Sequence, residues 1–102
     1  MPITIEFIGG PRDGERLAVP GDQATVGRED DCQVHFGRDT TVSRRHVGIT
    51  WEGSQYFIED LNSRHGTFVD GEKMTGPMRQ VLAIGQVVRV GGSRLAVVND
   101  ER

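Results

Sequence analysis

The sequence predicts an all-β domain, and three observations carry this prediction. Apolar residues occur in short runs, several of them alternating with polar residues, and no window shows a sustained helical period. Residues typical of turns separate these runs at near-regular spacing. Glycine accounts for 14 of the 102 residues, about double its average usage, which indicates many tight turns. Together these features predict a β-sandwich of two twisted, mostly antiparallel sheets with roughly eleven strands.

The first half of the chain is expected to form short strands divided by glycine and proline turns. Residues 3–8 alternate apolar and polar side chains, and the segment Gly9–Gly14 supplies the next turn, because glycine and proline adopt the special backbone angles of turns. A second strand is predicted over residues 16–19, ending at Pro20. Shorter third and fourth strands are predicted over residues 24–27 and 33–36.

The second half continues the same pattern. Residues 46–51 and 56–59 flank the polar segment 52–55, which predicts a hairpin. Residues 67–69 run directly into Asp70 and Gly71, a dipeptide that favours the type I′ turn of a two-residue hairpin. The closing strands are predicted over residues 81–84, 87–90 and 95–98.

Length and composition predict a single domain over residues 1–102, long enough to bury one core without disulfides or metals. Hydrophobic residues make up only 35% of the chain, and their concentration in short runs fits a thin core between two sheets. The net charge of −3 argues against a nucleic-acid partner, because non-specific nucleic-acid binding needs a broad basic surface.

Cysteine content and hydropathy give the expected location. Cys32 is the only cysteine, so the chain cannot form an internal disulfide, and a reducing cytoplasm is the expected setting. The sequence contains no signal peptide and no apolar run long enough to cross a bilayer, so no membrane association is expected. The histidines and the cysteine lack the spacing of a metal site, and neither a metal nor a cofactor is expected.

Three polar segments between the predicted strands stand out as candidate ligand-binding loops. Loops held by a rigid sheet often bind ligands, and guanidinium and hydroxyl groups are the donors that hold a phosphate. Taken alone, each segment would be an ordinary turn, and an isolated arginine at a strand end is usually only solvated. The segments are Gly27-Arg28, Ser43-Arg44-Arg45-His46, and the run from Asp60 to Gly71.

This ordered set of motifs resembles the forkhead-associated (FHA) domain, a family that reads phosphothreonine peptides. The run from Asp60 to Gly71 matches the family pattern D-L-x-S-x-N-G-T-x-V-N-G at all but two positions. The resemblance covers nearly the whole chain and implies an FHA/SMAD-like sandwich without catalytic activity. It also implies a phosphothreonine-dependent protein-binding module in Ser/Thr kinase signalling, whose partner is a phosphothreonine-containing protein or peptide.

The resemblance assigns roles to the polar loop residues. It implies that Arg28 pairs with the phosphate and that the hydroxyl of Ser43 donates to a phosphate oxygen. Arg44 and Arg45 bring further positive charge to the same loop. In the second loop it implies a bracing role for Ser63, a position near the phosphothreonine for Arg64, and a grip on the peptide backbone for His65. Structural roles are implied for Gly27, His46, Gly66, Thr67, Asp70 and Gly71.

His65 and Asp70 are the two departures from the family pattern, because each stands where relatives carry asparagine. An imidazole can still donate and accept hydrogen bonds, but with a different reach and with sensitivity to pH. Asp70 preserves the turn, because Asp-Gly serves in a type I′ turn as well as Asn-Gly. It is expected to place a negative charge near the peptide groove.

Three alternatives compete with phosphopeptide binding. The first is an interaction domain of the same fold that binds its partner without phosphate, an alternative that the two departures keep open. The second is a hydrolase using Ser43, His46 and Asp60, but no nucleophile elbow surrounds the serine and all three residues occupy positions of the FHA motifs. The third is a nucleic-acid reader, whose mark would be a steep dependence of binding on salt.

Overall fold

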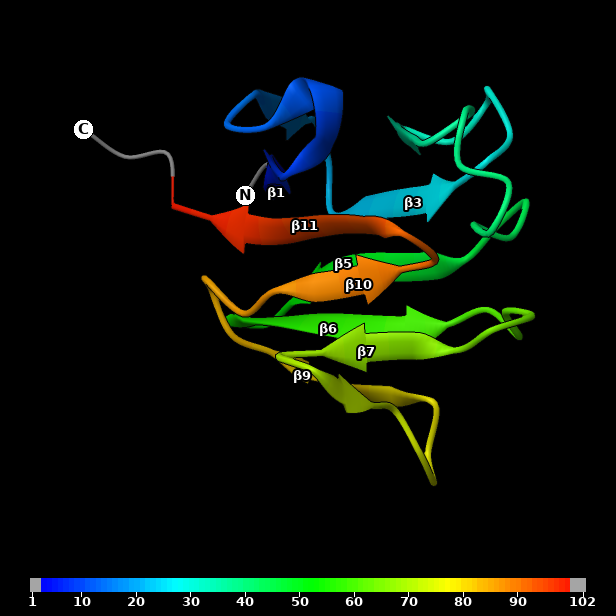
Figure 1. The fold of residues 1–102 in the computed structure, drawn as a ribbon. Coiled ribbons are helices and arrows are strands. Elements are labelled where there is room, and N and C mark those ends of the chain that lie inside the picture. Colours follow the sequence, from blue (N-terminus) through cyan, green and yellow to red (C-terminus); the bar gives the residue numbers. More distant parts are fainter. Residues whose placement is uncertain (1–2, 100–102) are drawn as a thin grey trace.

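A computed structural model describes residues 3–99, which fold into two stacked sheets (Figure 1). The only helix in this part of the chain is the 3-10 turn η1 (Gly10–Arg12). No helix in residues 3–99 is long and apolar enough to cross a membrane. The strands are β1 (Ile3–Ile8), β2 (Arg16–Val19), β3 (Gln23–Gly27), β4 (Val34–His35), β5 (Val47–Glu52), β6 (Gln55–Asp60), β7 (Thr67–Val69), β8 (Glu72–Lys73), β9 (Arg79–Leu82), β10 (Val88–Val90) and β11 (Ser93–Val98).

The two sheets have the strand orders β2-β1-β11-β10-β7-β8 and β4-β3-β5-β6-β9. Within residues 3–99, β3 and β4 form the one parallel pair and every other pair is antiparallel. The predicted β-sandwich of mostly antiparallel sheets is therefore confirmed.

The core lies between the sheets, and the alternation of apolar residues along the strands builds it. In β1, Ile3, Ile5 and Phe7 are buried against residues of the facing sheet such as Ile49 of β5 and Ile58 of β6. Burying one such side chain fully contributes about 1.5–3 kcal/mol. The remaining core residues come from both sheets in the same way, so the sandwich forms one continuous core and a fixed frame for its loops.

Most predicted strands are confirmed, with ends shifted by no more than two residues. The strand predicted over residues 81–84 is the one displaced as a whole, because the structure places it two residues earlier, at Arg79–Leu82. Pairing with β6 fixes this strand, since Leu82 lies opposite Tyr56 and is buried. The chain then leaves the sheet in a turn, where the Gln86 backbone N–H donates to the Ala83 carbonyl. The apolar run at residues 81–84 therefore spans a strand end and part of a turn.

The hairpin between β7 and β8 has the predicted two-residue turn. Asp70 and Gly71 have positive φ angles of 50° and 83°, as a type I′ turn requires at both central positions. The Asp70 carboxylate accepts a hydrogen bond of 2.8 Å from the Val87 backbone N–H. Asp70 thus lies at the end of β7 remote from Gly66, with its carboxylate bonded to the turn that precedes β10.

The candidate ligand-binding loops gather at one end of the sandwich, at the right of Figure 1. The segment 28–33 follows β3, the segment 36–46 connects β4 to β5, and the segment 61–66 connects β6 to β7. The two described ends of the chain lie at the other end, at the left of the same view. The fold thus brings residues from distant parts of the sequence to one edge.

Candidate functional site

Backbone hydrogen bonds hold the segment 43–46 alongside the end of β3. The Arg28 N–H donates to the Ser43 carbonyl at 3.0 Å, and the His46 N–H donates to the Val26 carbonyl at 2.8 Å. The expected phosphate-binding residues Arg28 and Ser43 are therefore joined directly through the main chain. Their relative position is set by backbone geometry, independently of the rotamers of either side chain.

This close approach explains the glycine of the Gly27-Arg28 motif. A Cβ atom at Gly27 would overlap the Arg44 carbonyl oxygen and would lie 2.9 Å from the Cys32 Sγ atom. The φ angle of Gly27 is not positive, so glycine is needed here for space and not for backbone freedom. Any side chain at this position would push the segment 43–46 away from β3.

We expect Gly27→Ala to destabilise the fold and to weaken ligand binding together. Overpacking of this kind costs about 1–3 kcal/mol, and each kcal/mol shifts the melting temperature of a domain of this size by roughly 4–8 °C. Thermal denaturation followed by circular dichroism measures the shift. Gly48→Ala is the matched control, because a Cβ atom at Gly48 meets nothing within 4 Å; equal melting temperatures for the two variants would contradict this account.

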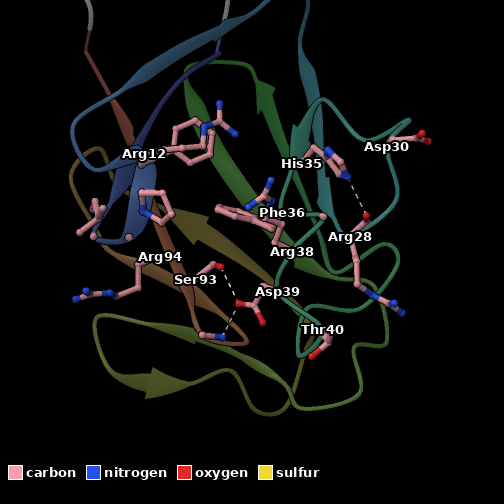
Figure 2. Close-up of a pocket in the computed structure, with 17 residues that line it drawn as sticks. Arg12, Arg28, Asp30, His35, Phe36, Arg38, Asp39, Thr40, Ser93 and Arg94 are labelled. Carbon is pink, nitrogen blue, oxygen red and sulfur yellow. Dashed lines mark hydrogen bonds between the residues drawn. The ribbon is translucent and has the colours of Figure 1, made fainter.

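Arg28 is anchored and still has donors to offer. Its Nε–H donates to the Val42 carbonyl at 3.0 Å, while its terminal nitrogens donate to none of the residues in the described range 3–99. Figure 2 shows its guanidinium directed outward, and shows His35 Nε2 bonded to the Arg28 carbonyl at 3.0 Å. An anchored arginine with free terminal N–H groups suits bidentate contact with phosphate oxygens.

Ser43 links two of the loops and keeps its hydroxyl proton available. Its Oγ accepts the backbone N–H of Arg64 at 2.9 Å. A hydroxyl can accept hydrogen bonds and donate one at the same time, so this contact leaves the Ser43 proton free for a ligand. The bond also fixes the backbone of Arg64 beside Ser43, across 21 residues of sequence.

His46 is fully buried behind these residues and bonded on both ring nitrogens. The Ser43 N–H donates to Nδ1 at 3.1 Å, and the ring contacts the Gly66 carbonyl through Nε2 at 2.9 Å. Because Nδ1 accepts and a carbonyl can only accept, the proton must lie on Nε2. The ring therefore ties the segment 43–46 to the segment 61–66. Because it is fully buried, it is not exposed for contact with a ligand.

Asp60 braces the segment 61–66 from within, a role that its motif position did not reveal. Its carboxylate accepts the Ser63 N–H at 2.8 Å, the Ser63 hydroxyl at 2.7 Å and the Thr67 hydroxyl at 2.6 Å. Burial alone would raise the pKa of Asp60, but the hydrogen bonds from Thr67 and Ser63 outweigh it and hold the pKa below its usual value. Ser63 donates its proton inward, so its hydroxyl braces the loop.

The depressed pKa of Asp60 has a consequence for stability. A carboxyl group whose folded pKa lies below its unfolded value stabilises the fold above about pH 4, and this contribution is lost as the pH falls through the folded pKa. We expect the free energy of unfolding of Asp60→Asn to fall less between pH 7 and pH 3 than that of the wild type. Urea denaturation measures both, with Asp30→Asn at an exposed position as control; parallel pH profiles for wild type and Asp60→Asn would contradict the role.

The remaining predicted residues differ in where they point. Arg44, Arg64 and His65 are exposed at the loop end of the sandwich. Arg45 is also exposed, but it forms an ion pair of 2.5 Å with Asp31 and a longer one of 3.8 Å with Glu29. The structure therefore brings Arg28, Ser43 and Arg64 together, while Arg45 is turned toward the acidic segment 29–31.

Lys73 is a cation beside the site that motif reasoning missed. A Cβ atom at Gly66 would lie 2.6 Å from Lys73 Cε and 3.4 Å from Lys73 Nζ, so the lysine stem packs on this glycine. The signal was present in the sequence, because a two-residue turn at Asp70 and Gly71 pairs Lys73 with Phe68. No group of three or more His, Cys, Asp or Glu residues within 3–99 is placed to hold a metal ion.

Comparison with known proteins agrees with this architecture. The family model described as "FHA domain" matches residues 24–91. The oxoglutarate dehydrogenase inhibitor of Corynebacterium jeikeium is 33% identical over 93 residues, covering 91% of this chain and 62% of that protein. The FHA domain-containing protein FhaB of Mycobacterium tuberculosis is 34% identical over 82 residues, covering 80% of this chain and 51% of that protein. The chain thus spans about half to three fifths of these relatives.

A solved structure is similar to this chain in both fold and sequence. It comes from a study of phosphothreonine-dependent FHA domain interactions and superimposes with a TM-score of 0.82 at 31% identity, covering 100% of both chains. Three findings agree on the family of this chain. They are the two sheets with the observed strand order, the loops gathered at one end, and the family match over most of the chain. The chain belongs to the FHA domain family.

Proposed function

We propose that this domain binds a phosphothreonine-containing segment of a partner protein in Ser/Thr kinase signalling, without catalysing a reaction. The observation that carries the proposal is the joined group of Arg28, Ser43 and Arg64. Hydrogen bonds between three loops fix these residues side by side before any ligand arrives. Arg28 retains free terminal N–H groups and Ser43 retains its hydroxyl proton, so both point to an anionic acceptor.

The chemistry of phosphothreonine matches these donors. Near pH 7 its phosphate carries about −1.5 to −2 charges and three strong acceptor oxygens. In this proposal the Arg28 guanidinium binds phosphate oxygens and the Ser43 hydroxyl donates to another. Arg44, Arg64 and Lys73 add positive charge around them, and the exposed His65 contacts the backbone of the bound peptide. The backbones that carry Arg28, Ser43 and Arg64 are held by hydrogen bonds before binding, which lowers the ordering entropy lost at these loops.

The setting of the domain follows from its relatives and its chemistry. A related structure was studied for phosphothreonine-dependent interactions, and the same class of partner is proposed here. The single cysteine, Cys32, is buried and unpaired, which supports a reducing, cytoplasmic environment.

Binding of matched peptides tests the proposal. A degenerate phosphothreonine peptide library supplies a preferred sequence, which is then made with phosphothreonine, phosphoserine and unmodified threonine. We expect calorimetry to show the tightest binding for phosphothreonine and the weakest for the unmodified peptide. Burial of the threonine methyl group contributes about 0.8 kcal/mol, or roughly a fourfold preference over phosphoserine. Equal affinity for the phosphorylated and unmodified peptides would reject the proposal in favour of a phosphate-independent interaction.

A further inference from the structure

A broad groove adjoins the proposed phosphate site and shares Arg28 with it, while its other lining residues have no role in phosphate binding. It has a volume of about 1090 Å³ and is bounded by the turn around η1, the segment 36–40 and the turn between β10 and β11. Arg28 lines one side of this groove. Figure 2 shows Arg28 and Arg94 on opposite sides of the view, with Arg12 and Arg38 between them. A segment bound at Arg28 could therefore continue into the groove.

The groove concentrates positive charge on a protein that is acidic as a whole. Besides Arg28, it is lined by Arg12, Arg38 and Arg94, while the net charge of the chain is −3. Arg38 and Arg94 have no carboxylate partner among residues 3–99. Arg12 shares only an exposed contact of 3.5 Å with Glu15. Three guanidinium groups thus keep donors available for a ligand.

The two acidic residues of the lining, Asp30 and Asp39, offset only part of this charge. Asp39 uses its carboxylate internally, accepting the Gly92 N–H at 2.9 Å and the Ser93 hydroxyl at 2.7 Å (Figure 2). These bonds hold the turn between β10 and β11 against the segment 36–40. Asp30 is exposed and points away from the arginines in the same view. With four guanidinium groups against two carboxylates, the lining keeps a net positive charge.

Packing fixes the walls of the groove in the absence of a ligand. The Arg12 guanidinium lies 3.7 Å above the Phe7 ring, which meets Phe36 edge to face at 5.5 Å. The Arg94 guanidinium packs on Gly9, where a Cβ atom would lie 2.6 Å from its terminal nitrogen. Two of the three cations are thus held by contacts with the frame, which lowers the entropy lost on binding.

We propose that this groove binds an acidic run of aspartate and glutamate residues on the same partner segment that carries the phosphothreonine. The inference rests on the proposed function, because the phosphate at Arg28 anchors the segment. Guanidinium groups bind carboxylates in a bidentate manner. A nucleic acid fits poorly, since Phe7 is buried, Phe36 is only half-buried, and neither ring is presented for base stacking.

Paired phosphothreonine peptides test the groove. In one set an acidic run lies on the N-terminal or the C-terminal side of the phosphothreonine, and in the matched set asparagine and glutamine replace every acidic residue. We expect one acidic peptide to bind about fivefold or more tightly than its amide counterpart at low salt, because several exposed charge pairs each add a small favourable contribution. The preference should shrink as the salt approaches about 1 M, where the screening length is about 3 Å.

Variants locate the effect in the groove. Arg38→Gln and Arg94→Gln should each reduce the preference for the acidic peptide while leaving affinity for the amide peptide unchanged. Arg79→Gln is the matched control, because it removes the same charge from β9, where Arg79 pairs with Glu52 at 2.8 Å. Circular dichroism confirms that each variant is folded before calorimetry.

The outcomes separate the groove from the phosphate site. Phosphate-dependent binding with equal affinity for acidic and amide peptides would overturn the groove proposal and leave the proposed function standing. An equal loss of preference in Arg79→Gln and Arg38→Gln would also overturn it, because the effect would then reflect net charge. If neither phosphopeptide bound, both proposals would fall together.

Discussion

Replacing His46 with alanine is expected to lower the melting temperature by about 12 °C or more and to abolish phosphopeptide binding. The substitution removes a fully buried ring and leaves the Ser43 N–H and the Gly66 carbonyl without partners. Each buried group left unpaired costs about 1–3 kcal/mol, and the cavity adds to this. A total near 3 kcal/mol corresponds to such a shift for a domain of this size. Thermal denaturation and calorimetry measure the two effects.

His35→Ala is the matched control for this experiment. His35 is only half-buried, and within residues 3–99 its ring makes a single hydrogen bond, to the Arg28 carbonyl. Its loss should cost a fraction of the effect at His46. A His46→Ala protein with the melting temperature of the wild type would show that the ring does not hold the two loops together.

Arg28→Ala is expected to weaken phosphopeptide binding tenfold or more while the domain remains folded. The substitution removes free N–H donors from a group that is exposed at the loop end. Hydrogen bonds to charged groups contribute about 1.5–3 kcal/mol each, and 1.4 kcal/mol corresponds to a factor of ten in affinity. Ser43→Ala should weaken binding in the same direction, because it removes the hydroxyl donor. Calorimetry on folded variants, checked by circular dichroism, provides the measurement.

Arg45→Ala is the informative comparison. Arg45 is the same residue type in a neighbouring loop, but its guanidinium is paired with Asp31 and Glu29. We expect its loss to change affinity less than threefold, within the about 1 kcal/mol typical of exposed charge pairs. If Arg45→Ala weakened binding as much as Arg28→Ala, the phosphate would have to lie on the other side of the segment 43–46.

The strands could be predicted from sequence because local signals specify them. Alternation along β1 and the Asp70-Gly71 turn depend on residues close in the chain, and both agree with the structure. The position of β9 could not be predicted in this way. Pairing with β6 determines where this strand begins, and that pairing draws Arg79 and Gln80 into the sheet ahead of the apolar run. Register across strands is information that the local pattern lacks.

Part of the candidate site could likewise be predicted from local sequence motifs, and part of it depends on the assembled fold. The positions of Arg28 and Ser43 follow from motifs that resemble a known family. The inward role of Asp60, the ion pairs of Arg45 and the approach of Lys73 to Gly66 depend on side-chain directions set by the assembled fold. The Asp39 bonds to Gly92 and Ser93 span 53 and 54 residues. No local pattern connects such distant positions, so the groove was not predictable from sequence.

The pairing of the first and last strands determines how this domain can be tethered. Thr4 lies opposite Val98 in the pairing of β1 with β11, so the two described ends of the chain leave the sandwich side by side, away from the loop end (Figure 1). Neighbouring ends favour domain insertion and circular permutation. A carrier protein or a surface attached at either end would leave the candidate ligand-binding loops unobstructed. Two copies joined through this end would leave the candidate ligand-binding loops of each copy accessible. A doubly phosphorylated target could then bind both copies at once, with the added affinity of two linked contacts.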